Sequence, residues 1–158
     1  MKSQITTKSE KETIEFAEKF LREALRGAER DKPLIFWLEG ELGAGKTQFV
    51  KGLAAGLDIK DRITSPTFVL MKKFKIPKTN PAAKKGKSLF FHIDCYRIYD
   101  SEDAKQIGLD EVIKNPRASV AIEWAERIVD IIPEPYWKLN FEHVEESNRK
   151  ISIKNVSR

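Results

Sequence analysis

Eight residues, 40–47, have the types and the spacing of a phosphate-binding loop, G-x-x-x-x-G-K-[ST]. Main-chain N–H groups in a glycine-rich turn that opens a helix bind a concentrated anion with little help from side chains. The ammonium of Lys46 suits the β- and γ-phosphates of a nucleoside triphosphate, and the hydroxyl of Thr47 suits one ligand position on Mg²⁺. We therefore expect a nucleotide to contact Glu41, Leu42, Gly43, Ala44, Gly45, Lys46, Thr47 and Gln48.

Two predicted strands end in a carboxylate that could serve the same site. The apolar run 89–94 ends in Asp94, and a second apolar run, 119–123, ends in Glu123. In phosphoryl transfer such an acid holds Mg²⁺ through its water shell or positions the attacking water. Spacing does not choose between the two acids, and both could serve. His92 is expected in the core or behind a ligand, because Mg²⁺ prefers oxygen ligands.

Two further segments each have a structural and a functional interpretation. Thr64-Ser65-Pro66-Thr67 is either an ordinary turn or a switch in which a hydroxyl or a carbonyl senses the γ-phosphate and its metal. Its position after the helix that follows the phosphate loop does not decide between the turn and the switch. Trp124 either fills the core or offers a flat surface beside the nucleotide. Because aromatic side chains usually pack, we favour the core for Trp124.

The elements that must position these residues follow from hydrophobic periodicity and turn signals. Residues 34–39 predict a strand buried on both faces that leads directly into the loop. A helix with one apolar side begins near Lys46. Two alternating runs, 137–141 and 150–154, predict a hairpin that extends the sheet.

The N-terminal region predicts an amphipathic helix. Ser9 and Glu12 form a capping box, and apolar residues then recur at helical spacing up to Gly27. Residues 5–7, just before this helix, are either a frayed terminus or a strand close to a bound base.

Length and composition are those of a single-domain globular protein. The chain has 158 residues, of which 41% are hydrophobic and 34% charged, so it can form a core. The one cysteine, Cys95, allows no internal disulfide and favours a reducing compartment. The N-terminus does not resemble a signal peptide, and no apolar run approaches the length of a membrane span. We therefore expect a cytoplasmic protein that does not bind a membrane.

The net charge of +5 belongs to one segment. Residues 72–87 contain seven lysines and no acid, and the rest of the chain has 22 basic against 24 acidic residues. Prolines, a glycine and few apolar residues predict a flexible, solvated loop at about 72–88, between strands at 68–74 and 88–94. The alternative is an electrostatic contact with RNA or with an acidic protein surface.

Four landmarks together resemble the TsaE family, the small ATPases of bacterial tRNA threonylcarbamoyladenosine biosynthesis. They are residues 40–47, Ser65-Pro66-Thr67-Phe68, His92-Ile93-Asp94-Cys95-Tyr96-Arg97 and Ile122-Glu123-Trp124-Ala125-Glu126. Their order, spacing and the total length all fit, so the resemblance covers nearly the whole chain. It implies a single α/β P-loop NTPase domain, 1–158, of three layers, in which helices flank a central mixed sheet with a parallel core and antiparallel hairpin strands.

The resemblance also implies a role for each landmark, with ATP or ADP and Mg²⁺ as cofactors. Residues 64–67 would form the first switch, and Thr67 would contact the nucleotide. Asp94 would be the catalytic acid, and Glu123 would hold Mg²⁺. Both acids, with Thr47, would serve the metal, and Lys46 would assist catalysis. Trp124 would lie next to the nucleotide.

The partner that the resemblance implies is the TsaD–TsaB pair, which transfers a threonylcarbamoyl group to an adenosine of tRNA. Hydrolysis by this chain would reset that complex between turnovers, and activity in isolation would be weak because partner contacts complete the site. The tRNA would be met through the complex, although residues 72–87 could also contact it directly.

Two other functions stay open from the sequence. The first is a binding module in which the bound nucleotide, without essential hydrolysis, drives assembly. The second is a small-molecule kinase, which usually needs an arginine-bearing lid. Arg97 is the one candidate arginine after the second core strand, so the kinase is disfavoured.

Overall fold

The computed structural model describes residues 2–65 and 70–157 as one mixed β-sheet with helices on both faces. Its strands are β1 (Lys2–Thr7), β2 (Leu34–Gly40), β3 (Met71–Lys75), β4 (Leu89–Asp94), β5 (Ala118–Glu123), β6 (Tyr136–His143) and β7 (Arg149–Val156). Its helices are α1 (Glu10–Arg26), α2 (Lys46–Gly56), α3 (Pro81–Lys84), α4 (Ser101–Gln106), α5 (Leu109–Lys114) and the 3₁₀ segment η1 (Ala125–Ile131). The predicted phosphate loop joins β2 to α2.

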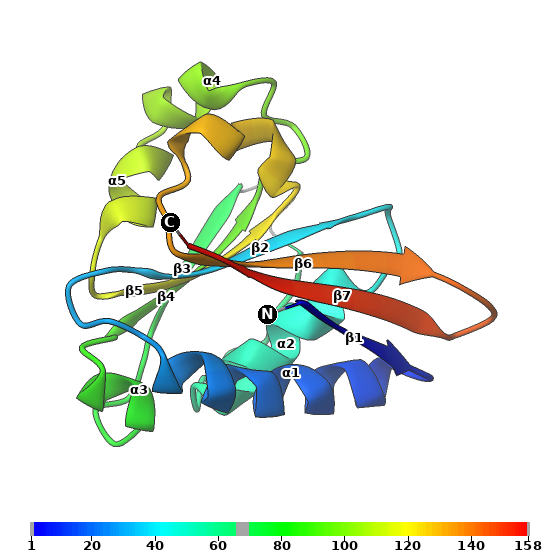
Figure 1. The fold of residues 1–158 in the computed structure, drawn as a ribbon. Helices are drawn as coiled ribbons and strands as arrows, with labels where there is room; N and C mark the ends of the chain where they lie inside the picture. The colour runs from blue at the N-terminus through cyan, green and yellow to red at the C-terminus, as the bar shows by residue number, and fades with distance from the viewer. Residues whose placement is uncertain (1, 66–69, 158) are drawn as a thin grey trace.

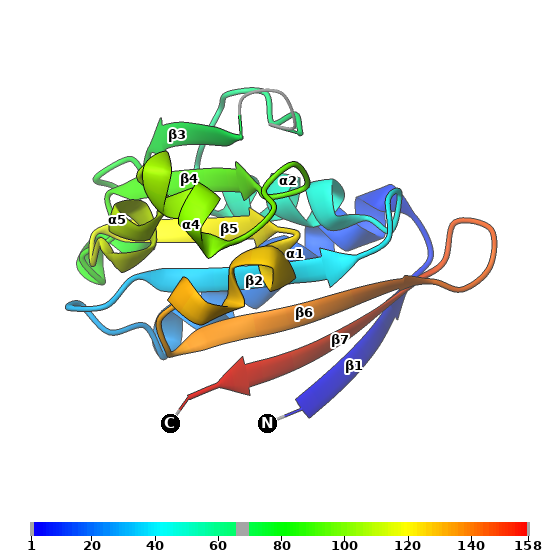
Figure 2. The ribbon, with the colours of Figure 1, turned by 90° about the horizontal axis from the view of Figure 1, so that it is seen from above.

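The strands lie in the order β1-β7-β6-β2-β5-β4-β3 (Figure 2). β2 is parallel to its neighbours β5 and β6, and β4 is parallel to β5. The pairs β1–β7, β6–β7 and β3–β4 are antiparallel. The predicted α/β fold with a parallel core and antiparallel hairpin strands is confirmed. In such sheets the carboxyl ends of the parallel strands share one edge, where ligands bind.

The sheet separates two apolar cores. One face is covered by α1, α2 and α3, and the other by α4, α5 and η1 (Figure 1). Side chains of β2 alternate between them: Phe36 and Leu38 pack on the first face, and Ile35 and Trp37 on the second. This is the arrangement expected of a strand buried on both faces, and it fixes the strand from which the phosphate loop emerges.

The first face is built on a close contact between α1 and α2. Ser9 caps α1 by accepting a hydrogen bond from the Glu12 N–H at 3.1 Å, and Glu12 Oε2 accepts from the Lys8 N–H at 2.7 Å. The predicted Ser9 cap is confirmed, and such a cap stabilises a helix by about 1 kcal/mol. The Glu12 side chain bonds to the N–H one residue before the N-cap, and not to the Ser9 N–H as in a standard capping box. On α2, a Cβ on Gly52 would lie 2.2 Å from the Ile14 carbonyl oxygen, so glycine lets the helices touch.

The lysine-rich segment differs in two respects from the predicted flexible, solvated loop. It contains helix α3, capped by Asn80, and it buries the side chain of Lys87 completely. Lys87 Nζ donates to the carbonyl oxygens of Glu29, Lys32 and Pro116 at 2.7, 2.6 and 2.9 Å. The prediction of a solvated lysine is wrong for Lys87. Its acceptors come from turns far apart in the sequence, so the charge pattern gives no sign of them.

Both ends of the chain join the sheet. β1 pairs along its length with β7, so the alternative of a frayed N-terminus is wrong and that of a strand is right. β6 and β7 contain the two predicted hairpin runs. The first residues of the strand predicted at 68–74 lie outside the described residues, and β3 begins at Met71. None of the helices in the described part of the chain has the length and apolar character needed to cross a membrane.

Candidate functional site

The loop at 40–47 needs glycine where the structure has it. Gly40 has a φ of 144°, and a Cβ there would lie 2.4 Å from the carbonyl oxygen of Phe141 on β6. Gly43 and Gly45 have φ of 75° and 102°, which only glycine adopts readily. No described atom outside its immediate chain neighbours lies within 4 Å of a Cβ built on Gly43. A ligand can therefore approach the backbone closely at this point.

The N-terminus of α2 is a suitable anion site. Its N-cap is Gly45, no side chain among the described residues caps it, and its first turn has no acid. The first N–H groups of a helix have no partner within the helix, and the helix dipole adds a partial positive charge there. The loop and this first turn line a cavity of about 590 Å³, a size typical of ligand sites.

Lys46 is buried at this cavity and turned back on its own loop. Its Nζ donates to the carbonyl oxygens of Gly40 and Glu41, the second at 2.9 Å, and lies 4.7 Å from the centroid of the Trp124 ring. Burial lowers the pKa of Lys46, whereas nearby carboxylates, chiefly that of Glu123, raise it. A desolvated ammonium whose acceptors are loop carbonyls can exchange them for phosphate oxygens.

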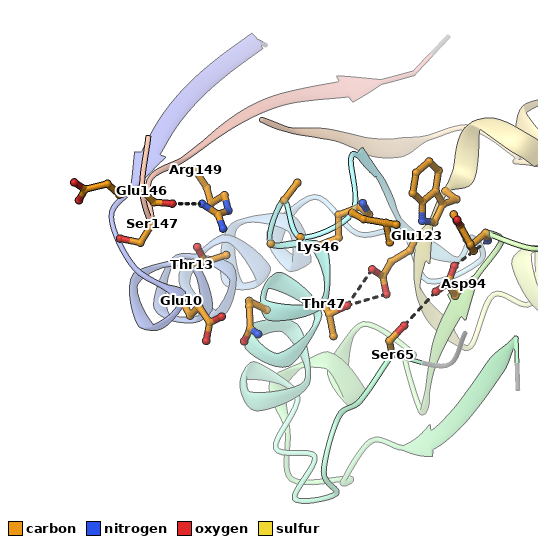
Figure 3. Close-up of a pocket in the computed structure, with 17 residues that line it drawn as sticks. Glu10, Thr13, Lys46, Thr47, Ser65, Asp94, Glu123, Glu146, Ser147 and Arg149 are labelled. Atoms are coloured by element: carbon orange, nitrogen blue, oxygen red, sulfur yellow. Dashed lines mark hydrogen bonds between the residues drawn. The ribbon is translucent and has the colours of Figure 1, made fainter. Parts of the chain in front are cut away.

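Glu123, at the end of β5, contacts the loop hydroxyl. Thr47 Oγ1 donates to Glu123 Oε1 at 3.1 Å (Figure 3). On its other side, Glu123 Oε2 lies 2.6 Å from Nε2 of the fully buried His92. His92 is thus placed behind a carboxylate, as one of the two sequence interpretations expected. The pair fixes the orientation of the Glu123 carboxylate beside Thr47.

Asp94, at the end of β4, lies opposite Glu123 in the register of the two parallel strands. Its Oδ2 accepts from Ser65 Oγ at 3.2 Å, and its Oδ1 accepts from the Tyr96 N–H at 2.9 Å (Figure 3). The two acids therefore have different neighbours. Glu123 contacts the phosphate loop, and Asp94 contacts the segment that the sequence offered as a turn or a switch.

The structure brings most of the predicted site residues to this one cavity. It is lined by residues 42–48, Asp94, Glu123 and Trp124. Trp124 also packs against the second core, as its favoured interpretation expected, and its contact with the nucleotide stays a prediction. The Glu41 side chain is not among the described residues that line the cavity, and Thr67 lies outside the described residues. Arg97 does not line it either. The catalytic roles of these residues stay predictions.

Sequence reasoning missed the other end of the cavity. That end is formed by Glu10 and Thr13 of α1 and by Glu146, Ser147 and Arg149 at the turn between β6 and β7. The interpretation of residues 5–7 as a strand near a base gave the only hint of it. These residues reach the loop because β6 pairs with β2, so the turn from β6 to β7 lies at the end of the sheet where the loop emerges. This is a property of the sheet order and not of local sequence.

The donors at the carboxylate end suit a magnesium ion that is held mainly by phosphate and water. One hydroxyl and two carboxylates offer hard oxygen ligands, which Mg²⁺ prefers. In the described part of the chain there is no group of three or more His, Cys, Asp or Glu side chains that could hold a metal ion without such help. Mg²⁺ commonly binds through one or two carboxylates together with phosphate oxygens, so the residues fit it.

Comparison with known sequences gives a consistent result. The family model described as "Threonylcarbamoyl adenosine biosynthesis protein TsaE" matches residues 7–151. A tRNA threonylcarbamoyladenosine biosynthesis protein TsaE from Treponema pallidum is 39% identical over 116 residues, 73% of this chain and 78% of that protein. The protein of the same name from Aquifex aeolicus is 34% identical over 154 residues, 95% of this chain and 94% of that protein.

A solved structure has the same fold. The crystal structure of YdiB from Bacillus subtilis superposes with a TM-score of 0.73 at 25% sequence identity, covering 99% of this chain and 87% of that one. The match therefore includes the outer strands and the hairpin as well as the phosphate loop.

Proposed function

The chain belongs to the TsaE family of tRNA threonylcarbamoyladenosine biosynthesis proteins, and from this premise we propose that it is an ATPase that uses Mg²⁺ and resets a TsaD–TsaB complex between turnovers. The observation that carries the proposal is the Thr47 hydroxyl on the Glu123 carboxylate, at an uncapped helix N-terminus. A loop hydroxyl and a strand-end acid in contact are the pair that holds a nucleotide's metal in P-loop enzymes.

At the phosphate end, the main chain of residues 43–48 would bind the α- and β-phosphates. Lys46 would leave the Gly40 and Glu41 carbonyls and donate to the β- and γ-phosphates. The lowered pKa of Lys46 does not remove its charge in the complex, because phosphate favours the ammonium form.

The two acids would have different roles in hydrolysis, because they have different neighbours. Glu123, oriented by His92, would hold the metal with Thr47. A bound Mg²⁺ supplies charge neutralisation at the phosphates. Asp94 would orient the attacking water, because it accepts hydrogen bonds from Ser65 and from the Tyr96 N–H at the segment offered as a switch. A movement of Ser65 would therefore shift the Asp94 carboxylate directly.

Partner contact fits the exposed side chains at the cavity mouth. Leu42 is 72% exposed and Tyr96 38% exposed, and both line the cavity. Exposed apolar side chains in such a place are typical of protein contacts. We propose that the TsaD–TsaB pair covers them. A direct tRNA contact by residues 72–87 remains a proposal as well, and Lys87 takes no part in it because it is buried.

The test is ATP hydrolysis with and without TsaD and TsaB, for the wild type and for Asp94→Ala. We expect stimulation by the partners, loss of hydrolysis in the variant, and retained partner binding. Failure of the partners to stimulate turnover would count against the proposal. If Asp94→Ala loses hydrolysis but still supports tRNA modification, binding alone is the essential event, and the chain is a nucleotide-gated binding module.

A further inference from the structure

We infer that Arg127 is a positioning residue for Asp94, and that it acts through the ring of Tyr96. This inference rests on the proposed hydrolysis and adds to it a residue from outside the cavity. Arg127 belongs to η1, which follows Trp124, and it is not among the described residues that line the cavity. Any effect of Arg127 on hydrolysis must therefore pass through other residues.

The turn after β4 holds the Asp94 carboxylate from the main chain. The Tyr96 N–H donates to Asp94 Oδ1 at 2.9 Å, so the orientation of this carboxylate depends on where the Tyr96 backbone lies. The Cys95 N–H donates to the Glu123 carbonyl oxygen at 2.9 Å, and the Ile98 N–H donates to that of Cys95 at 3.0 Å. Neither of these bonds holds the side chain of Tyr96, which is partly exposed at the cavity mouth.

Arg127 supplies contacts that hold this side chain. Its Cζ lies 5.9 Å from the centroid of the Tyr96 ring and 5.8 Å from that of the Trp124 ring, within the range in which a cation attracts an aromatic face. The centroids of the two rings are 5.2 Å apart. Arg127 Nη1 also donates to the Ile98 carbonyl oxygen at 3.2 Å. One guanidinium thus contacts the turn after β4 at a ring and at the backbone.

Trp124 does not depend on Arg127 in the same way. Its N–H donates to the Leu38 carbonyl oxygen at 3.1 Å, and its ring packs against the second core. Lys46 Nζ lies 4.7 Å from the same ring centroid. In the described part of the chain, the ring contacts of Tyr96 are those with Trp124 and Arg127. Loss of the guanidinium should therefore move Tyr96 and leave Trp124 and Lys46 in place.

This arrangement separates the positioning of water from the binding of the nucleotide. Attack on a phosphate depends steeply on geometry, and a displacement of about 1 Å can lower a rate by about a hundredfold. A shift of the Tyr96 backbone would turn the Asp94 carboxylate, which would orient the water. The contact between Thr47 and Glu123, which would hold the metal, does not involve this turn. We therefore expect Arg127 to affect kcat and not the affinity for Mg²⁺–ATP.

The first measurement is saturating ATP hydrolysis by the full-length chain without partners, together with calorimetric binding of Mg²⁺–ATP. The variants are Arg127→Ala, Arg127→Lys, Tyr96→Ala and the double variant with both alanines. The control is Lys105→Ala, which removes an exposed cation of α4 outside the cavity. Arg127→Lys keeps the charge but cannot contact two rings and a carbonyl together, and it serves if Arg127→Ala fails to fold.

We expect kcat to fall by about ten- to a hundredfold in Arg127→Ala, with the affinity for Mg²⁺–ATP unchanged. Arg127→Lys should lose most of this factor, and Lys105→Ala should lose nothing. Because Arg127 acts through Tyr96, the double variant should be no slower than Tyr96→Ala alone. Unchanged kcat in both Arg127 variants, a matching loss of nucleotide affinity, or additive losses in the double variant would overturn the inference.

Amide hydrogen exchange followed by NMR tests the same inference without hydrolysis. In Arg127→Ala the Tyr96 N–H should exchange about tenfold faster, because the ring no longer holds it on Asp94. The Trp124 N–H, which donates to Leu38, is the internal control and should keep its rate. Equal exchange of the Tyr96 N–H in variant and wild type would overturn the inference. Faster exchange together with no hydrolysis by the wild type would support the positioning of Asp94 and refute the proposed function alone.

Discussion

Two buried lysines lie at opposite ends of the parallel strands, and they differ in how their ammonium groups are satisfied. Lys46 follows the carboxyl end of β2, and Lys87 precedes the amino end of β4. Burial lowers the pKa of both. By exposure and by the direction of the pKa shift they look alike, although only Lys46 lies at the candidate site.

The acceptors distinguish them. Lys87 donates to three carbonyl oxygens, one for each N–H that an ammonium has. Two of them come from the connection between α1 and β2, and the third comes from the turn that leads into β5. Lys46 donates to two carbonyls of its own loop and lies near carboxylates at a cavity. A buried cation with a complete set of acceptors holds the fold together, whereas one with exchangeable acceptors is available to a ligand.

Replacing Lys46 with alanine tests the ligand side of this comparison and should have the largest effect. We expect ATP affinity to fall by about a thousandfold, roughly 4 kcal/mol, because the phosphates lose their charged donor. The free energy of unfolding should change by less than about 1 kcal/mol, since the loop carbonyls can be hydrated at the cavity. Calorimetric titration and urea denaturation measure the two. Unchanged nucleotide affinity would contradict the phosphate role of Lys46.

Replacing Lys87 with methionine tests the structural side. Three buried carbonyl oxygens would lose their donor, so we expect the free energy of unfolding to fall by about 3 kcal/mol. ATP affinity of the folded protein should stay as in the wild type. The matched control is Lys84→Met, three residues earlier at an exposed position, which should change stability by less than about 0.5 kcal/mol. Equal free energies of unfolding for Lys87→Met and Lys84→Met in urea would contradict the structural role of Lys87.

Glu123→Gln tests whether the carboxylate beside Thr47 serves a metal. The amide keeps the shape and can still accept from the Thr47 hydroxyl, but it has no charge. Affinity for Mg²⁺–ATP should fall by about ten- to a hundredfold, with affinity for ATP in EDTA unchanged. Glu142→Gln, which removes an exposed carboxylate outside the cavity, is the control. A loss of the same size in EDTA would show that Glu123 acts on the loop and not on the ion.

The pH dependence of stability at Cys95, next to Asp94, tests whether water is excluded from the carboxyl end of the sheet. Burial, helped by the Asp94 carboxylate, raises the pKa of the Cys95 thiol from 9.0 to about 12. Above pH 9 the unfolded chain loses this proton while the folded protein keeps it, so stability falls from pH 9 to 12. At pH 10 the wild type should have lost about 1.4 kcal/mol relative to Cys95→Ala, by urea denaturation of both. Parallel pH profiles would indicate that the thiol is hydrated.

Sequence reasoning succeeded where structure is set by local chemistry. The loop motif, the buried strand before it, the Ser9 cap of α1 and the two strands that end in acids all depend on neighbours a few residues apart. It could not decide between Asp94 and Glu123, because which acid contacts Thr47 depends on how β4 and β5 are placed relative to α2.

The failures concern residues whose partners are distant in the chain. In the sequence Lys87 is one more lysine of a solvated segment, whereas in the structure it donates to the carbonyls of Glu29, Lys32 and Pro116. In the sequence Arg149 is a cation at the end of a predicted strand, whereas in the structure the sheet order places it beside Gly45. In both cases the residue type is compatible with either role, and only tertiary packing selects one.

The place of β3 gives the remaining lysines a role that needs no binding partner. β3 is the edge strand beside β4, and it has only five residues, two of which are the exposed Lys73 and Lys75. An edge strand offers unpaired backbone groups to other copies of a protein, and short length and lysine side chains are the means by which natural sheets prevent such pairing. Part of the charge that suggests a nucleic-acid contact therefore keeps the sheet from aggregating at high concentration.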